Sequence, residues 1–492
     1  MKILLAGYNV DYDLIEELKQ SASYEREITP ETISAAYARI SRSPKAVDEL
    51  RCDALKEVDK ARRSNRNIVF EMGHNSVAEH AVFNIDVLGV SRLLVEEIEK
   101  FRLCSYTEKS QRYVLFDKDF VIPDEIREAG LADVFTETVK TQNDFYQSLY
   151  ATLRPYVFEK NAALADDPAN KSMFEGWAKE DARYAISLAT ETQLGMTLNA
   201  RNLELMLRRL AASSLAEGRL FAEKLYAATK DIAPSLIRYT KATDYDRLTH
   251  ENLRELTGRF PLQSSKQKAC AVKLLWSTPD ADRRAAAALL FASSAASYED
   301  CLKQAKKLTP AEAKALFRTS FRHMQPYDAA LREMENVDLL FELVMSASCF
   351  AQFKRHRMAT IISQEYDPTL GVTVPASVRA TGRHRDFMAM IRKTDRAFAL
   401  ISPKAPDAAA YVLTNAHRRR VLMKLNVREL YHVARLRADR FAQWDIRNVS
   451  KAMLSQAGKV MPLSLLMACG KDRFAALNKK VFPRASSIEV ST

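Results

Sequence analysis

The chain has 492 residues, too many for one ordinary hydrophobic core, and this length indicates two to four domains. Apolar residues make up 47% of it and charged residues 28%, and only 12 glycines and 16 prolines occur, which excludes collagen-like and linker-rich architectures. No apolar run approaches the roughly 20 residues that cross a bilayer, and the N-terminal stretch does not resemble a secretory signal. We therefore expect a cytoplasmic protein without a membrane partner.

The formal net charge of +12 indicates an anionic partner, which can be a nucleic acid or a phosphorylated small molecule. Charge alone does not choose between these classes. The six cysteines include no CxxC pair, which is poor spacing for zinc or for a disulfide framework. We expect reduced cysteines that mostly pack, Cys104 included, because nothing near it in the sequence clearly activates it as a nucleophile.

The first half of the chain predicts alternating strands and helices. Residues 2–7 (KILLAG) predict a strand, and residues 31–72 predict a long helical tract because apolar residues recur every three or four positions. Residues 81–87 (AVFNIDV) alternate between apolar and polar side chains, as in a half-buried strand. Residues 90–101 return to a helical period.

A polar segment, residues 241–268, breaks this pattern, so we place a linker here between a first domain, residues 1–240, and a second, residues 269–492. The second half then repeats the first. DLLFELVMSASCFAQFKRHR parallels NIDVLGVSRLLVEEIEKFR, and MKLNVRELYHVARLR parallels MTLNARNLELMLRRL. A repeat of this length indicates two copies of a whole domain.

The segment SYTEKSQRY, residues 105–113, concentrates hydroxyl, carboxylate and guanidinium groups. In an extended segment residues two apart share a side, so Glu108, Ser110 and Arg112 are expected to project together. An arginine beside a hydroxyl suits phosphate, because a guanidinium binds two oxygens at once. A solvated loop with salt bridges is the alternative.

Residues 73–80 (GHNSVAEH) predict a polar turn before the alternating strand. The spacing is not HExxH and no third ligand is near in the sequence, so no metal is expected here. We expect a turn that presents four side chains to a bound cofactor: His74, Ser76, Glu79 and His80. A purely structural turn is the alternative.

Two segments of the second half also carry candidate binding groups. KRHR, residues 354–357, follows an apolar helical stretch and could hold a phosphate or a flat ring, although most basic clusters are solvated surfaces. Asn426 and Glu429 have the spacing of a helix N-cap followed by a carboxylate.

Together these segments resemble the flavin-dependent thymidylate synthases, whose signature RHRxxSxxExSxR follows a GHxSxxEH-like turn and precedes an NxREL helix. The resemblance covers nearly the whole chain, twice over. The first copy has the turn and the second half of the signature, but KFR, residues 100–102, stands in the place of RHR. The second copy has a complete RHR, with Gln352 one turn before it, but MATIISQEYD replaces the remainder and the turn is missing.

Two further family arginines divide between the copies in the same way. The arginine that precedes the NxR element and contacts nucleotide in the family is Arg183 in the first copy, where the second has Ala410. The arginine that follows the element and helps ionise the uracil ring is Arg437 in the second copy, where the first has Leu210. Because nearly every element survives once, the resemblance implies one composite site shared by the copies.

The implied reaction is reductive methylation of dUMP to dTMP, with FAD as cofactor, methylenetetrahydrofolate as carbon donor and NADPH as reductant. The residues implied to bind dUMP are Gln352, Arg355, Glu108, Lys109, Ser110, Gln111, Arg112, Arg183 and Arg437, with Arg437 and Glu108 as catalytic groups. The residues implied to bind FAD are His74, Ser76, Glu79, Arg355, His356, Arg357, Asn199, Arg201, Asn426, Arg428 and His432.

The implied fold is α+β, with two fused copies that each have a small, mostly antiparallel sheet flanked by long helices. The copies are expected to form an internal pseudo-dimer, and two chains are expected to pair as a homodimer that imitates the family's tetramer. One alternative is a catalytically inactive flavin- or nucleotide-binding paralogue with a regulatory role, since each copy lacks part of the motif. A nucleic-acid-binding protein that uses HRRR, residues 417–420, is another, but no nucleic-acid module is recognisable and no such partner is expected.

Overall fold

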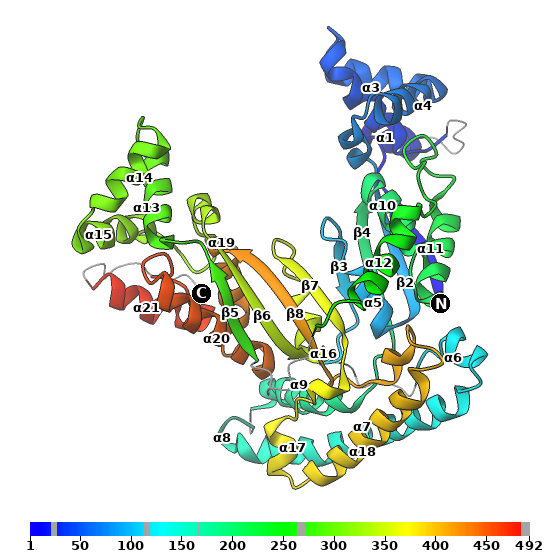
Figure 1. The fold of residues 1–492 in the computed structure, drawn as a ribbon. Coiled ribbons are helices and arrows are strands. Elements are labelled where there is room, and N and C mark those ends of the chain that lie inside the picture. The colour runs from blue at the N-terminus through cyan, green and yellow to red at the C-terminus, as the bar shows by residue number, and fades with distance from the viewer. Residues whose placement is uncertain (21–26, 113, 115–118, 166, 263–270, 484–492) are drawn as a thin grey trace. The chain divides into compact units, whose positions relative to one another are not determined.

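The computed structural model describes residues 1–20, 27–112, 114, 119–165, 167–262 and 271–483. The chain divides into two compact units, shown with their elements in Figure 1. Unit 1 comprises Met1–Ser264 and Ala376–Thr414, and unit 2 comprises Ser265–Pro375 and Asn415–Thr492. This division differs from the predicted boundaries, because residues 376–414 of the second copy belong to unit 1.

Each unit contains a four-stranded antiparallel sheet, and the two sheets have the same strand order, β1-β2-β4-β3 and β5-β6-β8-β7. The register repeats too, since Val82 pairs with Asn199 and Asp338 pairs with Asn426. The strands are β1 Lys2–Tyr8, β2 Val82–Ser91, β3 Ser105–Glu108, β4 Glu191–Asn199, β5 Val272–Ser277, β6 Asp338–Ser346, β7 Thr360–Tyr366 and β8 Arg418–Asn426. The chain is therefore α+β and consists of two copies of one fold.

Helices connect the strands in both units. Those of unit 1 are α1 Tyr12–Gln20, α2 Glu31–Arg39, α3 Val47–Lys56, α4 Val58–Arg66, α5 Arg92–Ile98, α6 Asp124–Glu128, α7 Ala132–Lys160, α8 Ala162–Ala165, α9 Lys171–Ala182, α10 Ala200–Leu210, α11 Ala216–Thr229, α12 Asp244–Thr257, α17 Ala376–Ala380 and α18 His384–Ile401. Those of unit 2 are α13 Ala281–Ala292, α14 Tyr298–Lys307, α15 Pro310–Phe321, α16 Ala347–Phe353, α19 Val427–Arg437, α20 Trp444–Val460 and α21 Phe474–Val481.

The sequence patterns predicted these elements with characteristic deviations. The alternation over residues 81–87 is confirmed, because the apolar side chains are buried and the polar ones exposed along β2. The predicted helical tract over residues 31–72 is broken into several short helices. The helix predicted from residue 90 begins at Arg92, because Ser91 still belongs to β2 and its Oγ caps the helix by accepting a hydrogen bond from Leu94 N.

The same capping residues recur in both copies. Ser91 and Ser346 end equivalent strands and cap α5 and α16, and each hydroxyl donates to a carboxylate from a later helix. In unit 1 the acceptor is Glu217, at 2.6 Å, and in unit 2 it is Asp445, also at 2.6 Å. These local devices hold the strand-to-helix junctions in place in both copies.

Residues 376–414 join unit 1 by packing on helix α7. Figure 1 shows α18 beside α7, and the Gln142 side chain of α7 donates from Nε2 to Thr394 Oγ1 and to the Val412 carbonyl, each at 2.8 Å. Further along, Leu188 N donates to the Leu413 carbonyl at 2.8 Å. Elements from both copies therefore pack together within unit 1.

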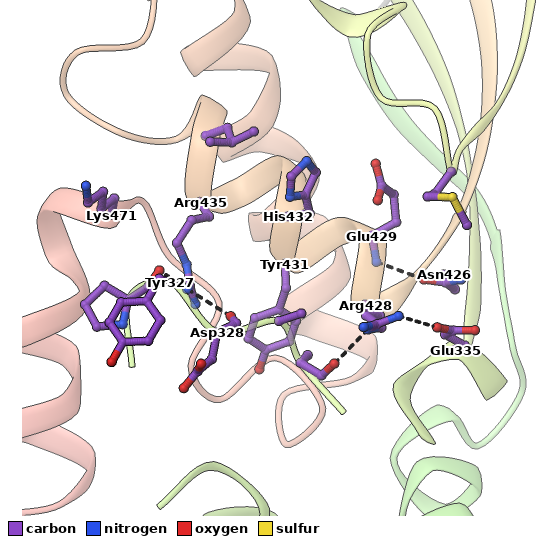
Figure 2. A pocket seen from close by; sticks show the side chains of 15 residues that line it. Tyr327, Asp328, Glu335, Asn426, Arg428, Glu429, Tyr431, His432, Arg435 and Lys471 are labelled. Atoms are coloured by element: carbon purple, nitrogen blue, oxygen red, sulfur yellow. Dashed lines mark hydrogen bonds and ion pairs between the residues drawn. The ribbon is translucent and has the colours of Figure 1, made fainter. Parts of the chain in front are cut away.

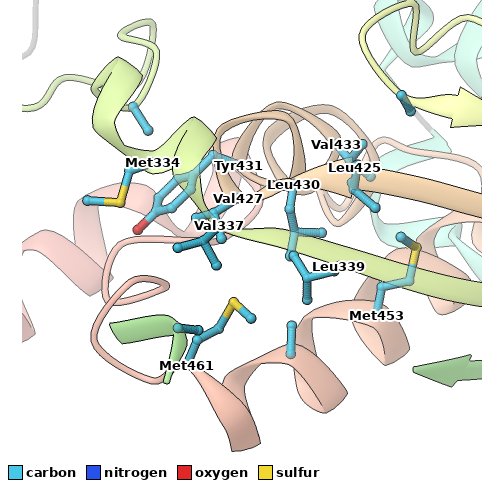
Figure 3. Close-up of a cluster of buried hydrophobic side chains, with 14 of the residues drawn as sticks. Met334, Val337, Leu339, Leu425, Val427, Leu430, Tyr431, Val433, Met453 and Met461 are labelled. Carbon is cyan, nitrogen blue, oxygen red and sulfur yellow. The ribbon is translucent and has the colours of Figure 1, made fainter. Parts of the chain in front are cut away.

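The core of unit 2 lies between β6, β8 and helices α19 and α20, as Figure 3 shows. Alternate residues of β6 are fully buried, namely Leu339, Phe341 and Leu343. Helix α19 contributes Leu430 and Val433 from its inner face. Truncating a fully buried ring such as Phe341 to alanine costs about 3–5 kcal/mol.

The basic run HRRR does not form an open patch. His417 is buried just before β8, and the arginines lie in that strand with partners inside unit 2. Arg418 donates to Thr373 Oγ1, Arg419 donates to the Gln364 carbonyl, and Arg420 pairs with Glu342 at 3.1 Å. The feature that suggested nucleic-acid binding is thus a structural part of the sheet.

We expect the stability of unit 1 to depend on pH through Glu217. Burial raises the pKa of this carboxyl, and hydrogen bonds from Ser91 and Tyr411 offset the effect only in part. Its contribution to the free energy of unfolding is therefore full below the ordinary glutamate pKa and is lost as pH rises through the raised value. Calorimetry between about pH 4 and pH 8 should show that the Tm of Glu217→Gln gains on wild type as pH rises.

Glu223→Gln, on the exposed face of the same helix, is the matched control. Its Tm should stay parallel to that of wild type across the pH range. A Glu217→Gln profile that also stays parallel would contradict the assignment.

Candidate functional site

The predicted cofactor turn of the first copy lies next to the NxR element. Residues 75–80 form a 3₁₀ helix, η3 Asn75–His80, and His74 and Ser76 are exposed on it. Glu79 Oε1 accepts a hydrogen bond from Arg201 Nη1 at 2.5 Å. Asn199 caps α10 by accepting from Asn202 N. The structure therefore brings the turn and the NxR element together within unit 1.

The second copy retains this turn in altered form, which corrects the expectation that it is missing. The strand register places η6 Arg332–Asn336 at the position of η3, with Glu335 at the position of Glu79. Arg428, the counterpart of Arg201, donates from Nη1 to Glu335 Oε1 at 2.7 Å. Ala330 and Arg332 stand at the positions of His74 and Ser76. The ion pair is therefore present in both copies, although the signature residues around it differ.

A cavity of about 550 Å³ lies beside this second turn. Figure 2 shows Tyr327 and Lys471 at one end of it and Asn426 at the other. The lining residues are Pro326, Tyr327, Asp328, Ala329, Ala330, Glu335, Met358, Asn426, Arg428, Glu429, Tyr431, His432, Arg435, Leu436 and Lys471. Three of the predicted FAD residues, Asn426, Arg428 and His432, are among them.

The shape of this cavity is fixed by helix α19. Asn426 is confirmed as the N-cap, because its side chain accepts from Glu429 N at 2.8 Å. Arg435 Nη1 donates to the carbonyls of the loop that carries Tyr327, including that of Asp328 at 3.1 Å. Apolar walls with nearby cations suit a planar ring that carries phosphates, so the residues present fit a flavin nucleotide.

The RHR segment directly follows α16. Arg355 and Arg357 are exposed, whereas His356 is only 2% exposed. Arg437 Nε donates to His356 Nε2 at 3.0 Å, and Arg437 Nη2 donates to the Gln352 carbonyl at 3.4 Å. The structure thus brings three predicted site residues together in unit 2.

The protonation of His356 follows from these contacts. Because Nε2 accepts from Arg437, the ring proton resides on Nδ1, which faces Glu429 Oε1 at 3.3 Å. Burial lowers the pKa of His356, the Arg437 charge lowers it further, and Glu429 opposes both. The imidazole is therefore neutral at physiological pH and orients the guanidinium of Arg437.

The segment SYTEKSQRY is extended only over β3, which ends at Glu108. The expectation that Glu108, Ser110 and Arg112 project together is therefore wrong. The Glu108 side chain is 2% exposed and pairs with Arg92 inside unit 1. Beyond it the chain turns, with Arg112 N donating to Ser110 Oγ at 3.2 Å, and Tyr113 lies outside the described residues. The alternation is lost because the strand ends at Glu108 and the chain turns after it.

Arg112 and Arg183 meet at a carboxylate that the sequence did not indicate. Arg112 Nε lies 3.2 Å from Glu180 Oε2, and both arginines interact electrostatically with Glu180. Burial raises the pKa of Glu180, an effect that the two cations oppose, and burial lowers the pKa of Arg183. Asp181 also acts on this cluster, so the two guanidiniums lie among two carboxylates.

Lys109 precedes the turn after β3, and Gln111 lies within it. Lys109 lines a cavity of about 420 Å³ on the sheet of unit 1, together with Asp86, Thr107 and Glu108. Gln111 is buried. The convergence of the unit 1 and unit 2 residues on one site stays a prediction.

Four contributors escaped the sequence reading. Arg92 and Glu180 pair with the predicted residues Glu108 and Arg112. Glu335 lies in the altered turn of the second copy, and Tyr327 lines the cavity beside it. A signal existed only for Glu335, which stands three residues before the strand that aligns with β2, as Glu79 does.

Two antiparallel sheets of the same strand order, each with its flanking helices, define a duplicated α+β protein. A family model described as thymidylate synthase complementing protein matches residues 25–235 and 273–463. The chain therefore belongs to this family, the flavin-dependent thymidylate synthases, as a tandem-duplicated form in which each copy carries part of the signature.

Some relatives align with most of this chain, and others align with about one copy of it. The chain is 25% identical over 429 residues to a UPF0159 protein of Chlamydia muridarum, covering 82% of this chain and 80% of that one. It is 32% identical over 217 residues to the flavin-dependent thymidylate synthase of Clostridium tetani, covering 43% of this chain and 82% of that enzyme. A solved flavin-dependent thymidylate synthase from Helicobacter pylori, complexed with FAD and dUMP, aligns with 48% of this chain and 100% of its own at 16% identity and a TM-score of 0.31.

The described residues lack both a membrane-spanning helix and a cluster of metal ligands. They contain no helix that is both long enough and apolar enough to span a bilayer. Nor do three or more His, Cys, Asp or Glu side chains gather anywhere among them in a way that could hold a metal ion.

We expect Arg437→Leu, which introduces the first copy's residue at the equivalent position, to raise the pKa of His356. The Arg437 charge lowers that pKa, so its removal leaves burial as the main remaining cause. Nitrogen-15 NMR of the imidazole measures the change. Because the lowered pKa stabilises the fold above the ordinary histidine value and this stability is lost as pH falls, the variant should also lose less stability on acidification than wild type does.

Arg440→Leu, which removes an exposed arginine just beyond the same helix, is the control and should leave His356 unchanged. A His356 pKa that stays the same or falls in Arg437→Leu would rule out the contact.

Proposed function

We propose that the chain is an active flavin-dependent thymidylate synthase with one composite nucleotide site, to which the two copies contribute different halves. The observation that carries this proposal is the complementary survival of charged groups. Unit 1 keeps Arg112 and Arg183 around Glu180, and unit 2 keeps Arg437 on His356. Where one copy has an arginine of this set, the other has Asp367, Ala410 or Leu210.

In this proposal the chain's own groups bind and polarise dUMP. Ser110, Arg112 and Arg183 hold the phosphate, for which bidentate guanidinium contacts are well suited. Gln352 and Arg355 orient the nucleotide. Lys109 and Gln111 complete the binding segment, and Glu108 anchors it from the buried end of β3.

Arg437 is the proposed catalytic residue. Placed near the uracil ring, its guanidinium stabilises the anionic form of the imide and so raises electron density at the carbon that is methylated. The neutral His356 supports this role, because it accepts a hydrogen bond from Nε of Arg437 without adding a second positive charge.

FAD is the proposed cofactor, and when bound it supplies the redox chemistry. The residues proposed to hold it are His74, Ser76, Glu79, Asn199, Arg201, Arg355, His356, Arg357, Asn426, Arg428 and His432. The unit 2 cavity supports this assignment, since Arg428, His432 and the aromatic ring of Tyr327 all line it. Methylenetetrahydrofolate as carbon donor, NADPH as reductant, a cytoplasmic location and a homodimer belong to the same proposal.

The purified chain should be yellow and should form dTMP from dUMP when methylenetetrahydrofolate and NADPH are supplied. Arg112→Ala and Arg355→Ala should each lower kcat/KM for dUMP about 100-fold, because each removes charge-assisted contacts from one half of the site. Lys100→Ala is the matched control for Arg355→Ala, since Lys100 holds the equivalent place in the first copy and pairs with Glu97 on the surface.

The same assays distinguish an active enzyme with a shared site from the alternatives. FAD binding without dTMP formation would support the inactive paralogue. Activity that survives both arginine substitutions would rule out the shared site.

We also expect calorimetry to find about one dUMP bound per chain rather than two. In the second copy Asp367 takes the position of Arg112 and its carboxylate accepts from Thr369 N at 2.8 Å, so it would repel a phosphate there. A stoichiometry near two would mean that the second half-site still works.

A further inference from the structure

Arg92 is a charged residue in an unusual position. It is the first residue of α5, where the helix dipole disfavours a cation, and it is only 5% exposed. Its backbone is fixed as well, because Arg92 N donates to the Thr190 carbonyl at 3.1 Å. A buried cation at a helix N-terminus requires a compensating anion.

That anion is Glu108, the last residue of β3. Its side chain lies on the same face of the strand as Tyr106, whose hydroxyl donates to the Ile98 carbonyl at 3.0 Å. Arg92 Nη1 donates to Glu108 Oε1, and the two side chains are 6% and 2% exposed. The contact therefore joins the start of α5 to the end of β3 inside unit 1.

The second copy supplies an internal comparison. Glu108 pairs with Leu194 in the sheet, and Ser363 pairs with Val421 at the equivalent point. Ala347, the first residue of α16, corresponds to Arg92. Both charges are thus present in the first copy and both are absent from the second, while the strand order and the helix cap are the same. The fold does not need the pair.

The Arg92–Glu108 pair is instead adjacent to residues 109–112, the segment whose charged side chains differ between the copies. Directly after Glu108, Lys109 N donates to the Gln193 carbonyl at 2.9 Å, and the chain then turns through Ser110 to Arg112. The copy that has the charged pair also has Ser110 and Arg112, and the copy without it has Glu365 and Asp367.

We propose that Arg92 is a positioning residue for nucleotide binding, an inference that rests on the proposed function. By holding the Glu108 carboxylate at the end of β3, it sets the point where the chain enters the turn and so aims Ser110 and Arg112 at the phosphate. Arg92 itself does not touch the nucleotide.

A double-mutant cycle on the full chain tests this role. Arg92→Ala leaves the Glu108 carboxylate buried without this cation, so its Tm should fall by several degrees, and its KM for dUMP should rise about tenfold with a smaller change in kcat. Arg92→Lys should recover part of the affinity. The double variant Arg92→Ala/Glu108→Ser reproduces the second copy, so its Tm should return towards wild type while its affinity for dUMP stays low.

FAD content and direct calorimetric binding of dUMP are measured for every variant. Wild-type FAD content throughout, with weakened dUMP binding in Arg92→Ala, supports the proposal. A Tm loss without any change in dUMP affinity would make the pair purely structural and overturn it, as would a double variant that regains affinity along with Tm. A wild-type chain that binds no dUMP would reject the proposed function itself, a failure visible before any variant is made.

Discussion

The buried side chain of Gln142 holds together the part of the molecule in which the two copies meet. Its amide donates to Thr394 and to the Val412 carbonyl, and both acceptors belong to the second copy. A buried amide left without acceptors is costly, so these contacts fix the register of α18 on α7. Tyr411 reinforces the arrangement by donating to Glu217 at 2.7 Å. Unit 1 therefore cannot be assembled from the first copy alone.

The duplicated frame and the diverged side chains follow different rules. The frame depends on backbone hydrogen bonds and caps, which recur at Ser91 and Ser346 and at Asn199 and Asn426. Such devices specify where a strand stops and a helix starts, whatever side chains the frame displays. Charged side chains on this frame can therefore differ between the copies without changing the fold. Arg92 and Glu108 show this, because both members of the ion pair are present in the first copy and both are absent from the second.

Local patterns predicted much of the fold from the sequence. Alternation predicted β2, repeated segments predicted two copies, and the Asn426 cap was visible in its spacing to Glu429. Helix α12 inside the supposed linker was also readable, because Thr243 and Asp246 form a capping box. The placement of residues 376–414 was not predictable, since it depends on contacts some 250 positions apart, such as that between Gln142 and Thr394, which spans 252.

The candidate site was likewise predictable only in part. Signature residues such as His356 and Arg437 were identified through the family resemblance, and they do lie in contact. The partners of Arg112 and Glu108 were not found. Glu180 and Arg92 belong to no motif, and each matters only because it neutralises the charge of its partner. The turn of the second copy was overlooked because its recognisable side chains had changed, while its geometry and the pair between Glu335 and Arg428 had not.

The position of α18 also bears on how this gene can evolve. Its buried face, which includes Phe387 and Ile391, packs in part on the first copy's α7. Splitting the gene between its copies would expose part of that face in one product and would deprive Glu217 of Tyr411 and Gln142 of Thr394 in the other. The packing of unit 1 therefore depends on the fusion of the two copies, apart from any chemistry that they share.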